Sequence, residues 1–310
     1  MTLRRRLKAP LAALYRVLPF KRPLLSALRA IGLGRLLPDW LAWNLAFDGP
    51  FTVRVEDTAI TMINGRGRGV EASLFWRGID GYERDTMRWW RRLVTRAGVI
   101  LDVGASTGVY ALTARALNPA AQVHAFEPME RMHRLLAETV RLNPPRDPGC
   151  SPIVINRLAV SDFCGEALMY DLPIEHSYVA SLDPGMDAGW RQPGTAVSEP
   201  VRVTRLDAYL QAAGCPGVDV IKLDIEGFEP AAIRGLGEWL MRCHPAFIVE
   251  ICNDAAGQAV EDAVRGCDYL YFVLSGGSPR RRAHLGNDKA GQVYSNYLIC
   301  TASVAREIGL

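Results

Sequence analysis

The sequence predicts an α/β fold, a doubly wound and mostly parallel sheet of seven strands preceded by an N-terminal helical and hairpin extension. Two observations support this. From residue 98 onward, short apolar runs alternate with segments of helical periodicity, the order typical of parallel strands joined by crossover helices. Before residue 80, the chain instead carries a basic, leucine-bearing segment and an alternating β-branched stretch. We therefore expect an extension over 1–80 and one large domain over 81–310.

The composition is that of a folded globular protein. The chain has 310 residues, of which 49% are hydrophobic and 22% charged, and its formal net charge is +3. Seven cysteines are spread singly, with no CxxC pair, which argues against a structural zinc site and a disulfide framework and predicts a reduced, cytoplasmic setting. No apolar run reaches the ~18 residues that a membrane-spanning helix needs.

Basic charge is concentrated near the N-terminus. Residues 1–100 carry 18 basic and 8 acidic side chains, whereas the rest of the chain carries 18 and 25. Within 1–40, leucines from Leu3 to Leu18 recur every three or four residues beside nine basic side chains, and prolines divide the segment into short helices. Two interpretations stay open. The segment docks on the main domain or on a second copy in a homodimer, or it lies peripherally on an anionic inner-membrane surface.

The remaining elements follow in order. Residues 51–75 predict a small hairpin around a turn at Asn64-Gly65, and 80–97 predict a helix. A further hairpin over 166–172 and 199–206 flanks a Gly/Pro/Asp-rich loop, 173–198, whose length in a compact domain favours a functional role. The seven strands are expected at 99–103, 122–126, 153–160, 218–224, 246–251, 269–274 and 293–300, with helices at 107–117, 130–142, 229–240 and 256–266.

The strongest functional signal is a glycine-bearing turn between the first strand and its helix. The strand leads through Asp102 into Gly104-Ala105-Ser106-Thr107-Gly108, and the second strand leads into Glu127, 19 residues beyond Gly108. Glycines let the backbone approach a ligand closely, and an acid at the second position can accept ribose hydroxyls. The turn departs from the Gly-x-Gly-x-x-Gly pattern that holds a pyrophosphate, and Asp102 would repel phosphate. This favours S-adenosylmethionine, which has an amine and a ribose but no phosphate, over a nicotinamide dinucleotide.

Several motifs together resemble a known family. DVGASTGVY (102–110), FEP (126–128), AVSD (159–162), KLDIEGFEP (222–230) and PAFIVEI (245–251) are similar to the FkbM-type methyltransferases of the class I, Rossmann-like fold. FWRGIDGYE (75–83) resembles the family's lead-in, and KxDxEGxE is the most specific part. Ser106-Thr107 stands where the family often has Asn-Ile or Asn-Val. The resemblance implies S-adenosylmethionine-dependent methyl transfer, most often to a hydroxyl of a sugar, glycolipid or secondary metabolite.

The resemblance also implies roles for individual residues. The glycine turn lines the methionine end of the cofactor, Glu127 holds the ribose, Ser161 and Asp162 meet the adenine, and Glu83 helps to fix the amino-acid moiety. The full set expected to bind the cofactor is Glu83, Asp102, Gly104, Ala105, Ser106, Gly108, Glu127, Pro128, Ser161 and Asp162.

Candidate catalytic groups follow the fourth strand. Lys222, Asp224 and Glu226 share one side of that strand if it stays extended, although a buried central strand should be apolar on both faces. Lys222 has a structural alternative, an ion pair with a carboxylate such as Glu250. Glu229 is assigned to the first turn of the next helix, where the helix dipole favours an acid.

A hydroxyl acceptor needs a general base, for which Asp224, Glu226 and His176 in the 173–198 loop are the candidates. A divalent metal held by Asp224 and Glu226 is an alternative that the sequence does not favour, because no third ligand is evident.

Other functions remain as alternatives. N-methylation of a small-molecule amine would need no base of this kind. A non-catalytic S-adenosylmethionine-binding protein would not be expected to keep the acids of KLDIEGFE. A nucleic-acid methyltransferase is disfavoured because no NPPY-like tetrapeptide follows the fourth strand and no aromatics are interleaved with the N-terminal basic residues. We therefore expect a small-molecule or glycan acceptor and no nucleic-acid partner.

Overall fold

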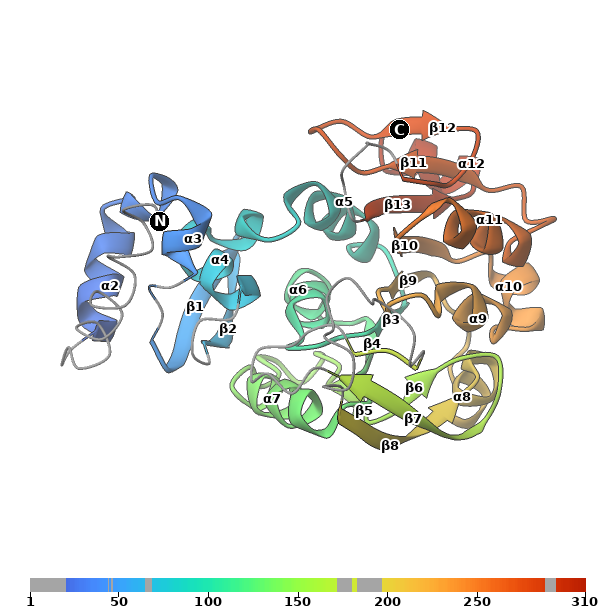
Figure 1. The fold of residues 1–310 in the computed structure, drawn as a ribbon, viewed down its shortest axis with the longest axis horizontal. Coiled ribbons are helices and arrows are strands. Elements are labelled where there is room, and N and C mark those ends of the chain that lie inside the picture. Colours follow the sequence, from blue (N-terminus) through green and yellow to red (C-terminus); the bar gives the residue numbers. More distant parts are fainter. Residues whose placement is uncertain are drawn as a thin grey trace, which may run out of the picture. The chain divides into compact units, whose positions relative to one another are not determined.

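The computed structural model describes residues 21–43, 45, 47–64, 69–171, 180–182, 197–287 and 294–310. The chain divides into two compact units (Figure 1). The first comprises Met1–Arg54 and Thr61–Tyr82, and the second comprises Val55–Ile60 and Glu83–Leu310. The Leu3–Leu18 stripe lies outside the described residues, as does most of the 173–198 loop.

The first unit is built around edge-to-face aromatic rings. The Phe47 and Phe75 ring centroids are 4.9 Å apart, and those of Phe51 and Phe75 are 5.6 Å apart. Such pairs add stabilisation beyond the burial of their area. The described elements that belong wholly or mainly to this unit are α2 (Lys21–Ala30), η1 (Leu33–Arg35), α3 (Asp39–Ala42), β1 (Gly49–Val55), β2 (Thr58–Asn64), α4 (Gly69–Arg77) and η2 (Ile79–Gly81).

The expected hairpin forms, but its turn is not at Asn64-Gly65. Strands β1 and β2 pair with each other and are joined by Glu56 and Asp57, where Glu56 adopts a left-handed φ of 51°. Two adjacent acids interrupt the apolar alternation there, so a two-residue turn forms between the strands. Asn64 is instead the last residue of β2, and its side chain is buried. Helix α4 begins at Gly69. The predicted position of the turn was therefore wrong: the turn precedes β2, whereas Asn64 lies at the end of β2.

The second unit contains a sheet whose strand order is β12-β11-β13-β10-β9-β3-β4-β5. Strands β5, β4, β3, β9 and β10 pair in parallel, and β13 runs antiparallel to both β10 and β11. The chain winds outward from β3 to β5 and then returns to β9, which makes the β3–β9 boundary the point where the strand order reverses. The strands are β3 (Val99–Val103), β4 (Gln122–Phe126), β5 (Ile153–Asn156), β9 (Val220–Leu223), β10 (Ala246–Ile251), β11 (Leu270–Val273), β12 (Arg280–Arg282) and β13 (Ser295–Cys300).

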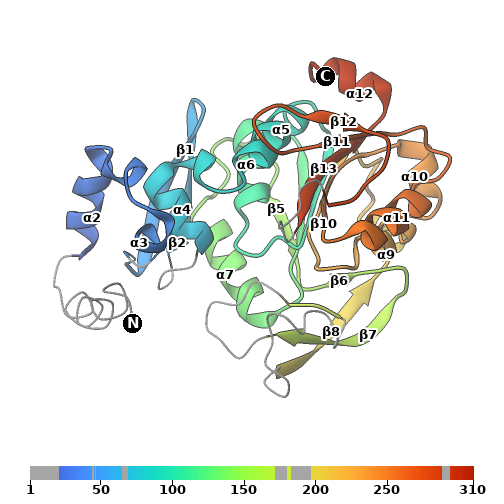
Figure 2. The same ribbon diagram turned by 45° about the horizontal axis from the view of Figure 1, so that its top comes forward.

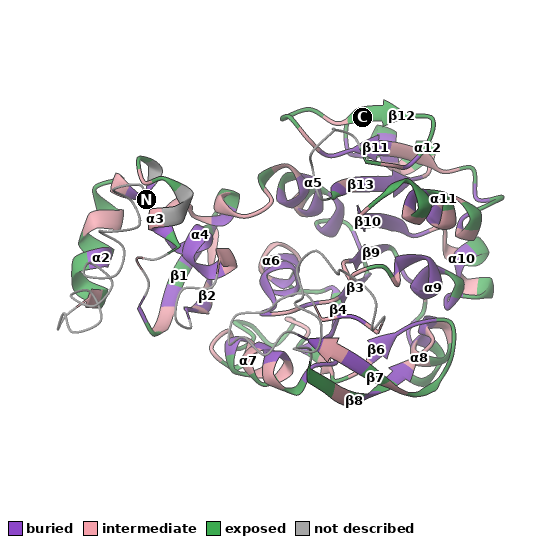
Figure 3. Cartoon of the chain, viewed as in Figure 1, coloured by how far each residue is buried: buried purple, intermediate pink, exposed green. Residues whose placement is uncertain are grey.

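This sheet has eight described strands where the sequence predicted seven. The additional strand, β12, consists of three exposed arginines that pair through their backbone with β11. Its residues show no apolar alternation, so nothing in their hydrophobicity marks them as a strand. The central strands β3, β9 and β10 are buried along their whole length (Figure 3), as expected for parallel strands covered on both faces.

The predicted third strand, 153–160, is divided between two sheets. β5 belongs to the main sheet, whereas β6 (Ala159–Val160) pairs with β8 (Val197–Thr204) in a separate three-stranded sheet (Figures 1 and 2). Between them, Arg157 forms an ion pair with Glu199 at 2.6 Å, which ties the point of division to β8. The hairpin predicted over 166–172 and 199–206 is confirmed as β7 (Gly165–Asp171) pairing antiparallel with β8.

Helices α8 to α11 contribute to the core on one face of the main sheet through Leu206, Leu210, Ile233, Leu240 and Val260. The helix predicted over 229–240 is two helices, because the chain is interrupted at Gly237, whose φ is 54°. No helix in the described part of the chain is long and apolar enough to cross a membrane. The helices of this unit are α5 (Arg84–Val94), α6 (Val109–Leu117), α7 (Glu130–Arg141), α8 (Leu206–Ala212), α9 (Glu229–Arg234), α10 (Glu238–Cys243), α11 (Asp254–Ala263) and α12 (Ala302–Glu307).

Candidate active site

The glycine turn between β3 and α6 packs directly against the segment that follows β9. Gly104 and Gly108 have φ values of 83° and 89°, and Ser106 has a φ of 49°. A Cβ atom at Gly104 would lie 2.9 Å from the carbonyl carbon of Asp224 and would overlap its oxygen. A Cβ atom at Gly108 would lie 2.6 Å from Cδ1 of Leu136. Two motifs that are more than a hundred residues apart in sequence therefore meet at the carboxyl edge of the sheet.

Glu127 is fixed beside this turn immediately after β4. Its carboxylate accepts a hydrogen bond from the backbone N–H of Ser106 and another from that of Met129, each at 3.0 Å. The residue is 7% exposed, and its neighbour Pro128 is also buried. Burial raises the pKa of Glu127 to about 8, although both amide bonds act to lower it. The structure thus brings Glu127 and Ser106 together, and their role in cofactor binding stays a prediction.

Asp102 lies inside the protein. Its Oδ2 accepts a hydrogen bond from the backbone N–H of Ala111 in α6 at 2.9 Å, and the residue is 1% exposed. Burial raises its pKa to about 6, while the nearby charge of Lys222 acts in the opposite direction. Asp102 Oδ1 and Ser106 Oγ are buried with no hydrogen-bond partner among the described residues. Asp102 therefore anchors α6 and borders Lys222, and it does not face outward.

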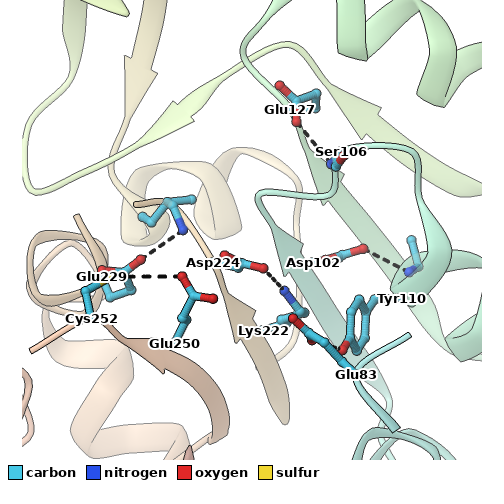
Figure 4. A network of polar contacts seen from close by, with 12 residues as sticks. Glu83, Asp102, Ser106, Tyr110, Glu127, Lys222, Asp224, Glu229, Glu250 and Cys252 are labelled. Carbon is cyan, nitrogen blue, oxygen red and sulfur yellow. Dashed lines mark hydrogen bonds and ion pairs between the residues drawn. The ribbon is translucent and has the colours of Figure 1, made fainter. Parts of the chain in front are cut away.

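Lys222, which is buried, forms an ion pair with Asp224, which is half-buried (Figure 4). Nζ of Lys222 donates to Oδ2 of Asp224 at 2.6 Å and lies 4.5 Å from the centre of the Tyr110 ring. The Tyr110 hydroxyl donates in turn to Glu83. Burial lowers the pKa of Lys222, but Asp224, Glu83 and Asp102 outweigh it and leave that pKa above its usual value. The sequence suggested Glu250 as the ion-pair partner of Lys222, but the partner in the structure is Asp224.

The turn after β9 ends the strand alternation. β9 stops at Leu223, and Glu226 has a φ of 56°, so Lys222, Asp224 and Glu226 do not share one face of an extended strand as predicted. Glu229 holds this turn, because its carboxylate accepts from the backbone N–H of Ile225 at 2.9 Å and of Gly227 at 3.0 Å. Glu229 is 1% exposed, and burial raises its pKa to about 7. Sequence reasoning missed this role. The available signal was an acid following a Gly turn by two residues.

Three carboxylates converge beside the ion pair. One oxygen from each of Glu83, Asp224 and Glu250 lies within 4.8 Å of the other two (Figure 4). Glu250 belongs to β10 and is 8% exposed. Burial raises the pKa of Glu250 well above its usual value, and the charges of Asp224, Glu226 and Glu83 add to this effect. A glutamate within the otherwise apolar run AFIVEI was the sequence signal for this position.

The two predicted adenine-binding residues, Ser161 and Asp162, contact α9 and the residue that follows it. Asp162 pairs with Arg234 of α9 at 2.8 Å, and a Cβ atom at Gly235 would overlap the carbonyl oxygen of Ser161. None of the contacts recorded for the described residues joins Ser161 or Asp162 to the glycine turn or to Glu127. Their adenine role stays a prediction. His176 lies outside the described residues.

Comparison with solved structures finds methyltransferases of low sequence identity. The FkbM methyltransferase from Methylobacillus flagellatus KT is 13% identical, with a TM-score of 0.43 over 66% of this chain and 43% of that chain. A putative SAM-dependent methyltransferase from Streptococcus mutans is 10% identical, with a TM-score of 0.45 over 82% and 56%. This chain thus spans less than half the length of the Methylobacillus protein. No curated protein matches the sequence.

The family itself is defined by a sequence match. The family model described as "Methyltransferase FkbM domain" matches residues 102–271, more than half of the chain. The match begins at Asp102 and ends within β11, so it includes the glycine turn, Glu127, the KLDIEGFE segment and Glu250. The chain therefore belongs to the FkbM family of S-adenosylmethionine-dependent methyltransferases and has the class I α/β fold.

Proposed function

We propose that this protein transfers the methyl group of S-adenosylmethionine to a hydroxyl of a sugar, glycolipid or secondary metabolite. The observation that carries this proposal is the position of Asp224. Its backbone contacts the glycine turn, while its carboxylate is held by the buried Lys222. An acid beside a cofactor turn suits an acceptor that loses a proton during methyl transfer.

The residues of the turn fit S-adenosylmethionine. Glu127 is a buried carboxylate whose two oxygens are oriented by backbone amides, and each oxygen keeps capacity to accept from a ribose hydroxyl. Gly104 and Gly108 leave no side chain between the backbone and a ligand. The hydroxyl of Ser106 is buried and has no partner among the described residues. When bound, the cofactor supplies an electrophilic methyl group on a sulfonium. We assign its contacts to Gly104, Ala105, Ser106, Gly108 and Glu127.

Asp224 is our candidate for the general base. The ammonium of Lys222 lies over the Tyr110 ring. It orients the Asp224 carboxylate by donating to one of its oxygens, Oδ2. The other oxygen is left to accept a proton from an acceptor hydroxyl aligned with the methyl group. Alignment and base assistance are the main requirements of in-line methyl transfer. Glu226 remains an alternative base, since its charge also acts on Glu250, and His176 remains one from the sequence alone.

A labelled-methyl screen tests the proposal. The full chain is incubated with S-adenosylmethionine carrying an isotopic methyl group and with panels of sugars, glycolipids, phenols and amines, and products are identified by mass spectrometry. We expect label on oxygen, together with loss of about 10²–10⁴-fold in turnover in Asp224→Asn while cofactor binding is retained. Label on nitrogen would contradict the hydroxyl assignment. A loss below three-fold in Asp224→Asn, Glu226→Gln and His176→Ala alike would place the base elsewhere.

A further inference from the structure

The convergence of Glu83, Asp224 and Glu250 places three carboxyl groups side by side at the carboxyl edge of the sheet. Glu83 immediately precedes α5, Asp224 follows β9 and Glu250 lies in β10, and one oxygen of each lies within 4.8 Å of the others. Three ionised carboxylates at this separation repel one another strongly away from bulk water. A bound cation relieves this repulsion while all three carboxylates stay ionised.

Lys222 does not supply that cation for all three carboxylates. Its Nζ donates to Oδ2 of Asp224 and packs over the Tyr110 ring, and it also borders Asp102. The charged groups with the largest effects on Glu250 are Asp224, Glu226, Glu83 and the ammonium of Lys222. One ammonium therefore faces at least four carboxylates.

Glu250 supplies an independent sign that a ligand is expected. Three glutamates at this edge of the sheet are buried, Glu127, Glu229 and Glu250. Two backbone N–H groups satisfy Glu127 and two others satisfy Glu229. For Glu250, no N–H or O–H of the described residues donates to the carboxylate, and its recorded contact is the weak thiol of Cys252 at 4.0 Å. A carboxylate that is nine-tenths buried without such a donor is costly, and this one is directed at two further carboxylates.

We propose that Glu83, Asp224 and Glu250 bind one divalent cation of the oxygen-preferring class, Mg²⁺, Mn²⁺ or Ca²⁺. Such ions lie about 2.0–2.6 Å from their oxygen ligands, so two ligands of one ion are separated by no more than about 4–5 Å. The 4.8 Å limit of this cluster meets that condition. All three donor atoms are carboxylate oxygens, the ligands that these hard cations select.

The role of the ion rests on the proposed function, whereas its binding does not. Bound next to Asp224, the cation would hold the acceptor through its hydroxyl oxygen and make that hydroxyl proton easier to remove. This would compensate for the limited basicity of a carboxylate that is already paired with Lys222. It would also leave the cofactor contacts at Glu127 and the glycine turn unchanged.

A direct titration with Mn²⁺ tests the site in the full chain, without cofactor or acceptor. Electron paramagnetic resonance reports free Mn²⁺, and competition with Mg²⁺ and Ca²⁺ reports selectivity. We expect one ion per chain with a Kd between about 10⁻⁶ and 10⁻³ M, the range seen for sites of this kind. Glu250→Gln and Glu83→Gln should each weaken binding by about ten-fold or more. Glu261→Gln is the control, because this partly buried carboxylate on α11 accepts from the backbone of Leu285 and lies outside the cluster.

Two outcomes would overturn the site. One is the absence of saturable binding by any of the three ions, and the other is unchanged binding in both cluster variants. Folding is checked by thermal unfolding without metal, where Glu250→Gln should be at least as stable as wild type because it removes a buried charge. Added Mn²⁺ should raise the Tm of wild type and of Glu261→Gln but not that of Glu250→Gln. S-adenosylmethionine binding, measured in parallel, separates the two proposals. If wild type binds S-adenosylmethionine but no metal ion, only the cation site is rejected. If wild type does not bind S-adenosylmethionine, the proposed function is rejected.

Discussion

Gly104 and the carbonyl oxygen of Asp224 are so close that no side-chain atom fits between them. The contact joins the turn after β3 to the turn after β9, the two strands at which the order of the parallel sheet reverses. Ligands of open α/β sheets bind at this kind of position. The glycine turn and the candidate base are therefore held close together by backbone contact, independently of any flexible side chain.

Gly104→Ala should disrupt this contact. Alanine at a φ of 83° costs about 1–2 kcal/mol by itself, and overlap with the Asp224 backbone adds to that cost. We expect a lower Tm and a marked loss of S-adenosylhomocysteine binding, measured by thermal unfolding and calorimetry. Gly266→Ala is the matched control, because Gly266 has a φ of 88° but nothing within 4 Å of its Cβ position. Equal effects of the two substitutions would show that the contact is unimportant.

Lys222→Met should destabilise the second unit. The substitution removes the ammonium beside the half-buried Asp224 and the buried Asp102, and the roughly 3–5 kcal/mol typical of breaking a fully buried pair is an upper limit for this change. Arg234→Met provides the comparison, since Arg234 and Asp162 form an exposed pair worth about 0–1 kcal/mol. Denaturant unfolding of both variants measures the difference. A loss below 1 kcal/mol in Lys222→Met would mean that the pair is not a structural anchor.

The sequence predicted most of the parallel strands because each is a short, mainly apolar run bounded by turn residues, as in VILDV and AFIVEI. It could not reveal β12, whose three exposed arginines pair with β11 through their backbone. The division of 153–160 was also hidden, because β6 pairs with β8, a strand distant in sequence. Local hydrophobicity carries no information about either contact.

The candidate site was predicted unevenly for a related reason. The glycine turn and Glu127 follow a local order along the chain, so their proximity could be inferred. The meeting of Glu83, Asp224 and Glu250 depends on three elements that are neighbours only in the fold. Strand alternation predicted that Glu226 shares a face with Lys222. The positive φ of Glu226 shows that the strand does not continue to this residue.

The N-terminal segment allows a further test of the two interpretations left by its sequence. We expect residues 1–20 to dock on protein, so that deleting them lowers the Tm or dissociates a dimer, while the intact chain does not sediment with liposomes. Membrane binding would instead give co-sedimentation that rises with anionic lipid and falls with salt, because each basic residue contributes ~1 kcal/mol at such a surface and is screened by ions. Loss of that co-sedimentation in the deletion variant would contradict docking.

Glu127 should make both cofactor binding and stability depend on pH. Its pKa in the folded protein is about 8, above its usual value, because the carboxylate is buried. The folded state therefore keeps a proton that the unfolded chain has already lost, so this group's contribution to stability falls as pH rises towards 8. Ribose hydroxyls donate to the ionised form, so affinity for S-adenosylhomocysteine should rise over the same interval.

Glu127→Gln isolates this carboxylate from the other groups that titrate nearby. Loss of two charge-assisted hydrogen bonds, each worth about 1.5–3 kcal/mol before water compensates, should weaken binding by about ten-fold or more above the pKa of about 8. Below that pH the wild type is protonated and the two proteins should converge. The difference in Tm between the variant and wild type should grow in the variant's favour as pH rises, because glutamine carries no buried charge. Calorimetry and thermal unfolding across this pH interval measure both differences, and curves that stay parallel would remove Glu127 from the ribose site.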